Sequence, residues 1–169
     1  MRKMIIAATM LFTAGISAAA ANAIGVQAPP STKTSATSFG PCALMTRQEA
    51  AAAVGEAVGE PKPIAPGRGA MPGVDVTACE YESATKHSVQ VTVWRFSESA
   101  GQFRQFYQAA IGKKERVPDL GDIASWYNAE HRELQVLKGS TLLILEIHRS
   151  GNATEVLTTA AKKALARLP

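Results

Sequence analysis

Alternation of apolar and polar residues is the most regular feature of this chain, and it predicts the β-strands. The segments VTACEYE (76–82) and SVQVTVWRF (88–96) alternate with a period of two around the turn SATKH. In the second segment the valines fall on one face, while Gln90, Thr92 and Trp94 fall on the other. Further strands are expected over residues 123–128, 132–138 and 141–148.

Apolar residues spaced by three and four positions predict three helices. The first, at about 47–54, follows a T-x-x-E capping box and stops before a glycine. The second covers about 99–111 and the third about 152–168. The resulting order, α-ββ-α-βββ-α, predicts an α+β fold in which an antiparallel sheet of about five strands has helices packed on one face.

A long connection rich in glycine and proline, residues 55–75, separates the first helix from the first strand pair. Part of it, residues 58–64, can form an edge strand. Connections of this length are unusual inside a compact domain, so residues 61–73 are a candidate binding loop. A surface loop held by a neighbouring crosslink explains the same composition.

The turn between the last two strands suggests a candidate metal site. If Gly139 and Ser140 are the two turn residues of a type II′ hairpin, the residue numbers of any two residues that face each other across the hairpin add up to 279. Two histidines and two glutamates then lie on one side of the sheet. Such a set suits a divalent transition metal such as zinc. Alternatively, it is the solvated face of a hairpin whose other face packs under the helices. The four residues are His131, His148, Glu133 and Glu146.

Two smaller groups are also candidates for binding. Asp119 and Asp122 flank a glycine near Trp126, which suits cation binding or sugar chemistry, although aspartates in such loops commonly form turns. Trp94, Phe96 and Trp126 can form an exposed aromatic patch for a partner or a glycan. Trp94 and Phe96 lie opposite the valines of their strand, so they can instead cover a second small core.

The N-terminal segment is typical of an exported protein. Residues 1–23 combine two basic residues, an apolar run and an A-x-A end, which predicts a cleaved signal peptide and no stable membrane span after cleavage. Residues 24–40 are rich in Ala, Pro, Ser and Thr, and they are expected to form a disordered linker. Residues 41–169 then form a single domain.

The two cysteines, Cys42 and Cys79, leave three roles open: a lipid anchor, a reactive or metal-binding thiolate, and a disulfide. A lipidated cysteine sits at the cleavage point, but Cys42 lies 19 residues beyond Ala23 (42 − 23 = 19). A thiolate site needs companions at short spacing, and neither cysteine has them. Outside the cytoplasm, an even count favours a disulfide.

Charge and the absence of known motifs argue against several classes of protein. The chain has 18 basic and 14 acidic residues, and loss of Arg2 and Lys3 with the signal lowers the net charge from +4 to +2. This balance argues against nucleic-acid binding. The sequence also contains no P-loop, no G-x-S-x-G elbow and no H-E-x-x-H motif.

Several phrases of the chain are similar to a family of uncharacterised bacterial exported proteins and lipoproteins. They are PCALMTRQEA (41–50), CEYES (79–83), VPDLGDIASWY (117–127), LQVLKGSTLLIL (134–145) and the closing AAKKALARLP. The resemblance implies a cell-envelope location, pairing of Cys42 with Cys79 and no catalytic activity. Many of these relatives carry a lipid-modified cysteine at the end of the signal, and this chain departs from that pattern.

These observations favour a small periplasmic or secreted binding or accessory module of the cell envelope. It is expected to act without a cofactor or catalysis, through the aromatic strand face and the Gly/Pro loop, on an envelope protein or polymer. One alternative is a metal-binding protein or metal-dependent hydrolase using the histidine and glutamate set. A second alternative is a secreted enzyme inhibitor that inserts residues 61–73.

Overall fold

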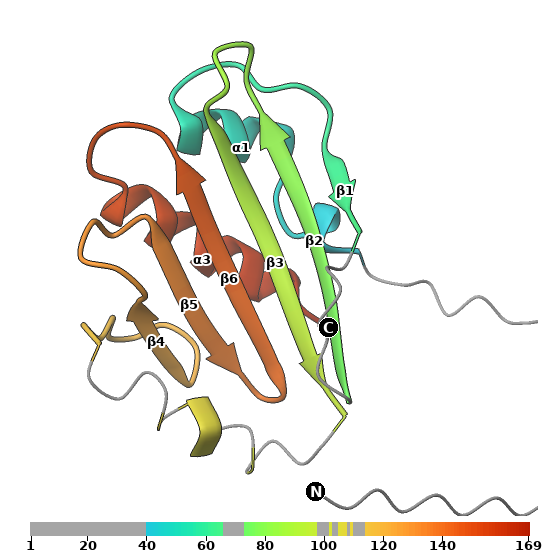
Figure 1. Cartoon of the computed structure of the whole chain (residues 1–169), viewed down its shortest axis with the longest axis vertical. Coiled ribbons are helices and arrows are strands. Elements are labelled where there is room, and N and C mark those ends of the chain that lie inside the picture. The colour runs from blue at the N-terminus through green and yellow to red at the C-terminus, as the bar shows by residue number, and fades with distance from the viewer. Residues whose placement is uncertain (1–39, 66–72, 98–101, 103–104, 108, 110–113) are drawn as a thin grey trace, which may run out of the picture. The chain divides into compact units, whose positions relative to one another are not determined.

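A single antiparallel sheet of six strands, in the order β1-β2-β3-β6-β5-β4, forms the centre of the computed structural model (Figure 1). The structure describes residues 40–65, 73–97, 102, 105–107, 109 and 114–169. The predicted signal peptide and all but the last residue of the predicted linker lie outside these residues. The strands are β1 (Lys62–Ile64), β2 (Val74–Glu82), β3 (Ser88–Phe96), β4 (Ile123–Trp126), β5 (Glu133–Lys138) and β6 (Thr141–His148).

The predicted antiparallel α+β fold is confirmed, with one strand more than expected. The additional strand, β1, lies within the predicted edge segment 58–64 and pairs with β2. The β5–β6 register is the predicted one, because Glu133 faces Glu146 and Lys138 faces Thr141, both summing to 279. Gly139, the first central residue of this turn, has a φ of 60°, as a type II′ turn requires.

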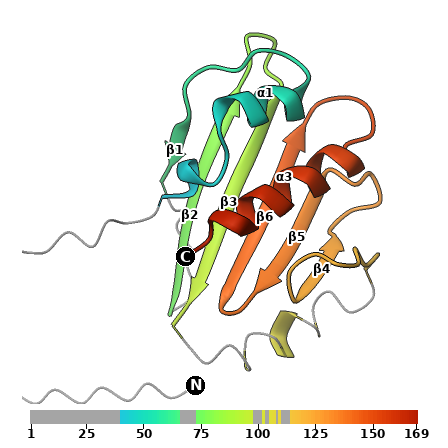
Figure 2. The ribbon, with the colours of Figure 1, turned by 180° about the vertical axis from the view of Figure 1, so that it is seen from behind.

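Two α-helices, α1 (Arg47–Val54) and α3 (Thr154–Arg167), lie on the same face of the sheet (Figure 2). The predicted capping box of α1 is present: Thr46 Oγ1 accepts from the Glu49 N–H at 3.2 Å, and Glu49 Oε2 accepts from the Thr46 N–H at 2.9 Å. The helix α3 begins two residues later than predicted, and Asn152 Oδ1 accepts a hydrogen bond of 2.7 Å from the N–H of its first residue, Thr154.

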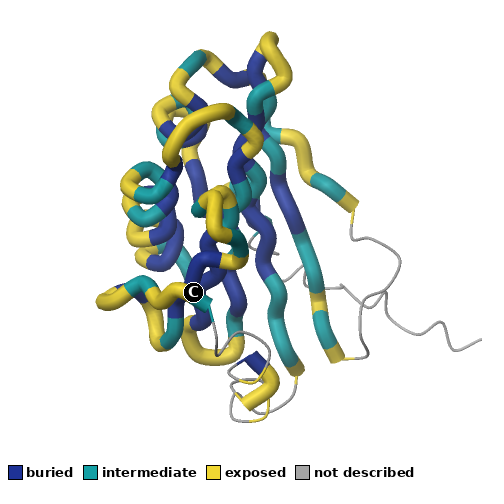
Figure 3. The backbone as a smooth tube through the Cα atoms, turned by 60° about the vertical axis from the view of Figure 1, so that its left-hand side comes forward, coloured by how far each residue is buried: buried dark blue, intermediate teal, exposed yellow. Residues whose placement is uncertain are grey.

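The main core lies between these helices and the sheet. The apolar faces of β3, β5 and β6 that the sequence pattern predicts are fully buried there. Figure 3 shows this burial as dark blue along the strands and the sheet-facing sides of the helices, and yellow at the turns and outer helix sides. The buried strand residues are Val89, Val91, Val93, Leu134, Val136, Leu143, Leu145 and Ile147.

A second, smaller core lies on the opposite face of the sheet. Tyr107 is 2% exposed and packs with Leu137 and Leu142, while Trp94 and Phe96 are partly buried against them. The expectation that all helices cover one face is therefore wrong for the region of the second predicted helix. The described part of that region, residues 102, 105–107 and 109, is helical. It packs here because this end of the sheet is apolar and requires cover.

The predicted disulfide is present. Cys42 and Cys79 are joined with an Sγ–Sγ distance of 2.12 Å, which links a short 3-10 turn (η1, Pro41–Ala43) to β2. The bridged residues are 37 apart in sequence, and constraint of such a loop in the unfolded chain stabilises the folded state by about 4 kcal/mol at most. The Tyr81 hydroxyl lies within hydrogen-bond distance of the Cys42 and Met45 carbonyl oxygens. The N-terminal end of the described domain is thus fixed to β2.

Among the described residues, no helix combines the length and the apolar character needed to cross a membrane.

Candidate functional site

The proposed metal ligands are divided between two places in the structure. Glu133 and Glu146 are opposed across β5 and β6, as the register predicts. His131 does not face His148, because β5 begins at Glu133 and His131 adopts a φ of 52° just before it. The last hydrogen bond of the ladder runs from the Ile147 N–H to the Arg132 carbonyl at 2.9 Å, and the chain turns away immediately beyond it.

His131 instead contacts β4, the segment before β4 and the first residue of α3. Its ring stacks on Trp126 with 4.8 Å between centroids, Nδ1 lies 3.0 Å from Thr154 Oγ1, and Nε2 lies 2.6 Å from Glu115 Oε2. His148 is exposed, with Nε2 3.4 Å from Glu146 Oε1. Within the described ranges, no group of three or more His, Cys, Asp or Glu residues is placed to hold a metal ion.

The three aromatic residues singled out in the sequence lie on two different faces. Trp126 is 3% exposed and belongs to the main core, whereas Trp94 and Phe96 lie on the opposite face with 6.4 Å between their ring centroids. The structure therefore shows a half-buried aromatic pair and not a group of three.

The two loop aspartates lie in turn conformations. Asp119 is exposed and has a φ of 55°, and Asp122 Oδ2 accepts a hydrogen bond of 2.8 Å from the Gly139 N–H. Asp122 thus ties the loop before β4 to the β5–β6 turn.

The side of the sheet opposite α1 and α3, called the open face below, has an acidic end and an aromatic end. Its carboxylates come from neighbouring strands in one row, in which Glu80 faces Gln90, Gln90 faces Glu146, and Glu146 faces Glu133. The pKa of Glu133 is raised because the side chain is buried and because Glu146 lies opposite. The next row on this face contains Thr92, Ile144 and Gln135, and the row after it contains Trp94 and part of the second core.

Both edges of the sheet are obstructed. The strand β1 has three residues, one of which is Pro63, which has no N–H to donate. The other edge strand, β4, is covered by the preceding segment, because the Val117 N–H bonds to the Ala124 carbonyl and the Trp126 N–H to the Glu115 carbonyl, each at 2.9 Å. Neither edge therefore offers a long strand with free backbone groups to which a strand of a partner protein could pair.

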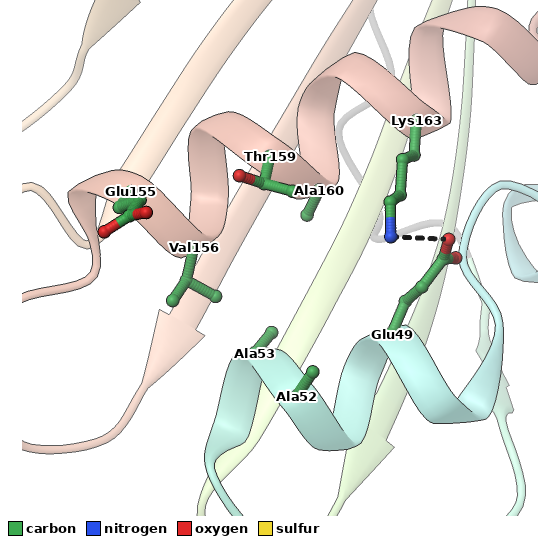
Figure 4. A pocket seen from close by; sticks show the side chains of 8 residues that line it. All are labelled: Glu49, Ala52, Ala53, Glu155, Val156, Thr159, Ala160 and Lys163. Atoms are coloured by element: carbon green, nitrogen blue, oxygen red, sulfur yellow. Dashed lines mark ion pairs between the residues drawn. The ribbon is translucent and has the colours of Figure 1, made fainter.

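A groove of about 350 Å³ separates α1 from α3 on the helix side (Figure 4). Half of its lining residues are small and apolar, three alanines and a valine, and Glu49 lies at one end, 3.5 Å from Lys163. Glu49 also bonds Arg167 Nη1 and Nη2 at 2.6 and 2.8 Å. The bonds from Arg167, with those from Thr46, lower the pKa of Glu49 to about 2. The polar group at this end of the groove is thus engaged in joining the two helices.

A polar cluster gathers where the β2–β3 turn meets the segment after α1. Glu56 Oε1 accepts hydrogen bonds from the Ser83 hydroxyl at 2.9 Å and from the Thr85 hydroxyl, and His87 Nδ1 lies 2.8 Å from it. The bonds from Thr85 and Ser83 hold the pKa of Glu56 below its usual value. This cluster lines a second pocket of about 350 Å³.

The cluster has the residue types of a nucleophilic triad but not its connections. In such a triad the serine hydroxyl bonds the imidazole, and the imidazole bonds the acid. Here the Ser83 hydroxyl donates directly to Glu56 and accepts a hydrogen bond of 3.1 Å from the His87 backbone N–H. Ser83 is also buried, with 5% of its surface exposed. The arrangement stabilises the turn and does not activate the serine.

Sequence patterns did not single out this cluster. His87 lies in the predicted turn SATKH and Glu56 in the Gly/Pro connection, so neither belongs to a motif. In the backbone, the two segments are joined by the pairing of Val58 with Ser83, an isolated bridge outside the named strands, and by the Gly59 N–H bond to the Glu82 carbonyl. A register based on that bridge places residue 56 opposite residue 85, but one bridge leaves no pattern in the sequence.

No protein-family model and no curated protein matches this chain.

Proposed function

We propose that the protein is an extracytoplasmic binding module that acts without catalysis and engages its partner through the open face of the sheet. In this proposal residues 1–23 are the export signal and residues 24–40 are a linker between the domain and its surroundings. The Cys42–Cys79 disulfide supports the location, because such bonds persist in oxidising compartments.

The observation that carries the proposal is a row of carboxylates and a half-exposed aromatic pair on one face, with Glu133 directly opposite Glu146 and His148 as the one basic side chain of the described chain in contact with the three row glutamates. Among the described residues, no lysine or arginine lies within ion-pair distance of Glu80, Glu133 or Glu146. Lys62 and Lys86, the neighbouring cations, both pair with Glu82. Charge repulsion within the row is relieved when a partner supplies a cation.

The chemistry of this face defines the partner. Trp94 and Phe96 offer a rigid apolar surface, and tryptophan is a frequent anchor of protein interfaces. We expect a protein segment that presents basic side chains beside apolar ones. Since the sheet edges are obstructed, this segment lies across the face and does not add a strand.

No specific observation supports either of the two alternatives, a metal-binding protein or hydrolase and an enzyme inhibitor. The histidines and glutamates of the metal hypothesis are separated, as described above. The inhibitor hypothesis depends on residues 61–73, of which 66–72 lie outside the described residues.

Affinity capture from an envelope extract, with bound proteins quantified by mass spectrometry, tests the proposal. The bait variants are Trp94→Ala and the double change Glu133→Gln with Glu146→Gln. The control is Thr159→Ala, an exposed position on α3 at the other side of the sheet. Loss of an interface tryptophan commonly costs about 2 kcal/mol or more, so we expect capture to fall by at least about tenfold.

The expected result is one protein, with a basic segment, that the wild-type and Thr159→Ala baits retain and the open-face variants lose. Thermal unfolding shows whether each bait is folded. Equal capture by the open-face variants, or no protein above the level of a blank matrix, overturns the proposal.

A further inference from the structure

Arg149, just beyond β6, lies in the pocket beside the polar cluster of Glu56 and His87. This pocket of about 350 Å³ is formed where the C-terminal end of α1, the β2–β3 turn and the residues after β6 meet. Its polar lining includes a guanidinium, an imidazole, a carboxylate and the hydroxyl of Ser150. These groups come from segments far apart in the sequence.

The guanidinium of Arg149 is incompletely partnered. Nη2 donates to the Asn152 carbonyl at 3.2 Å, but Nε is buried and has no hydrogen-bond partner. No carboxylate of the described chain forms an ion pair with it. A buried donor without a partner destabilises the folded state, so a ligand that accepts a hydrogen bond from it gains binding free energy.

Attraction to the end of α1 explains only part of this placement. The C-terminal end of a helix is partially negative and favours a nearby cation. Arg149 Nη1 lies against Gly55, the C-cap of α1, where an added Cβ would be 3.3 Å from it. Yet no hydrogen bond joins the guanidinium to a carbonyl of α1 among the described residues. The Nε group is left for another acceptor.

The charges of the pocket select the kind of acceptor. A guanidinium binds carboxylate and phosphate groups through two parallel N–H donors. Glu56 lines the same pocket without pairing with Arg149, so its charge opposes a dianion more strongly than a monoanion. We infer that the pocket binds a carboxylate group, with Arg149 as its principal donor and His87 and Ser150 beside it. The carboxylate belongs either to a small organic acid or to the C-terminus of a peptide.

Nuclear magnetic resonance of the ¹⁵N-labelled full chain tests this inference at the unpartnered atom. The arginine Nε–H signals are followed during titration with propionate, with N-acetyl-dialanine and with its C-terminal amide. Sodium chloride and sodium phosphate at equal ionic strength serve as references. We expect the Arg149 signal to shift saturably with a carboxylate, with a Kd on the order of 1 mM.

The two sources of carboxylate give different results. Tighter binding of N-acetyl-dialanine than of propionate, lost in the amide, identifies a peptide C-terminus. Comparable binding of propionate identifies a small organic acid. A shift with phosphate alone, or none beyond that caused by chloride up to about 50 mM, overturns the inference.

Variants separate the site from general charge effects. Arg149→Gln should abolish the saturable response of the remaining pocket signals, and Arg149→Lys, which keeps the charge but not the two-donor geometry, should weaken binding about tenfold. Arg132→Gln, at an exposed arginine outside the pocket, is the matched control and should bind as the wild type does. Unchanged binding in both Arg149 variants contradicts the inference. The outcome is independent of the open face, because none of its residues is altered.

Discussion

At the scale of single residues, Glu49 joins α1 to α3. It completes the capping box of α1, pairs with Arg167 through two hydrogen bonds and lies beside Lys163. Its side chain is 16% exposed. Because its pKa is about 2 in the folded protein against 4.5 ordinarily, Glu49 stabilises the folded state whenever it is ionised.

Replacement of this carboxylate gives a pH-dependent prediction. Glu49→Gln should lower the free energy of unfolding by about 2 kcal/mol at pH 7, after allowance for solvent screening. A depressed pKa contributes fully above pH 4.5 and is lost as the pH falls through about 2, so the difference from wild type should narrow over this window. Urea unfolding at several pH values measures it.

The control for this prediction is Glu155→Gln, an exposed glutamate at the other end of the same groove. Its effect should stay within about 0.5 kcal/mol. An equal loss of stability in both variants, or a Glu49→Gln effect that does not change with pH, contradicts the assigned role.

The sequence predicted the capping role of Glu49 but not its pairing with Arg167. The T-x-x-E spacing gives the capping box, since both partners lie within one turn. The pair with Arg167 spans 118 positions and exists only because α1 and α3 lie on the same face. Likewise, no local pattern could place Arg149 beside His87.

At the scale of elements, the β5–β6 hairpin and the loop before β4 each contain a glycine with the same positive φ. Gly121 and Gly139 both have a φ of 60°. A Cβ at Gly139 would meet nothing within 4 Å, whereas one at Gly121 would lie 2.6 Å from the Leu137 carbonyl oxygen. Substitutions at these two glycines therefore distinguish the cost of backbone strain alone from the cost of strain together with a steric clash.

Alanine at each position tests this difference. Gly139→Ala should cost about 1 kcal/mol through the positive φ alone. Gly121→Ala carries the same strain and also forces β4 away from β5, so we expect a loss of about 3 kcal/mol. Chemical unfolding of both variants measures the two costs, and equal costs would refute the close approach at Gly121.

Regular elements were predictable where one face is buried against the main core. The strands β2, β3, β5 and β6 and the helix α1 follow their patterns closely, because each carries one apolar face. The prediction of opposed histidines failed at the hairpin end, where His131 contacts Glu115 and Thr154 from other elements. The side of the sheet that Tyr107 covers was likewise set by the apolar end of the open face.

At the scale of the whole molecule, the two faces of the sheet have different roles. The helix face is closed by the main core, by the disulfide beside it and by the Glu49 contacts. The open face carries a row of carboxylates, in which Glu133 lies opposite Glu146, and a half-exposed aromatic pair. Composition could not identify this surface, because neighbouring residues on it belong to four different strands.

The central claim is that the partner binds the open face and not the helix face. Photo-crosslinking in living cells tests it most directly, with a photoreactive amino acid at position 94 or at position 159. We predict a specific adduct from position 94 and none from position 159. An adduct from position 159 alone, or no adduct from position 94 in a folded and stably produced protein, would contradict the account.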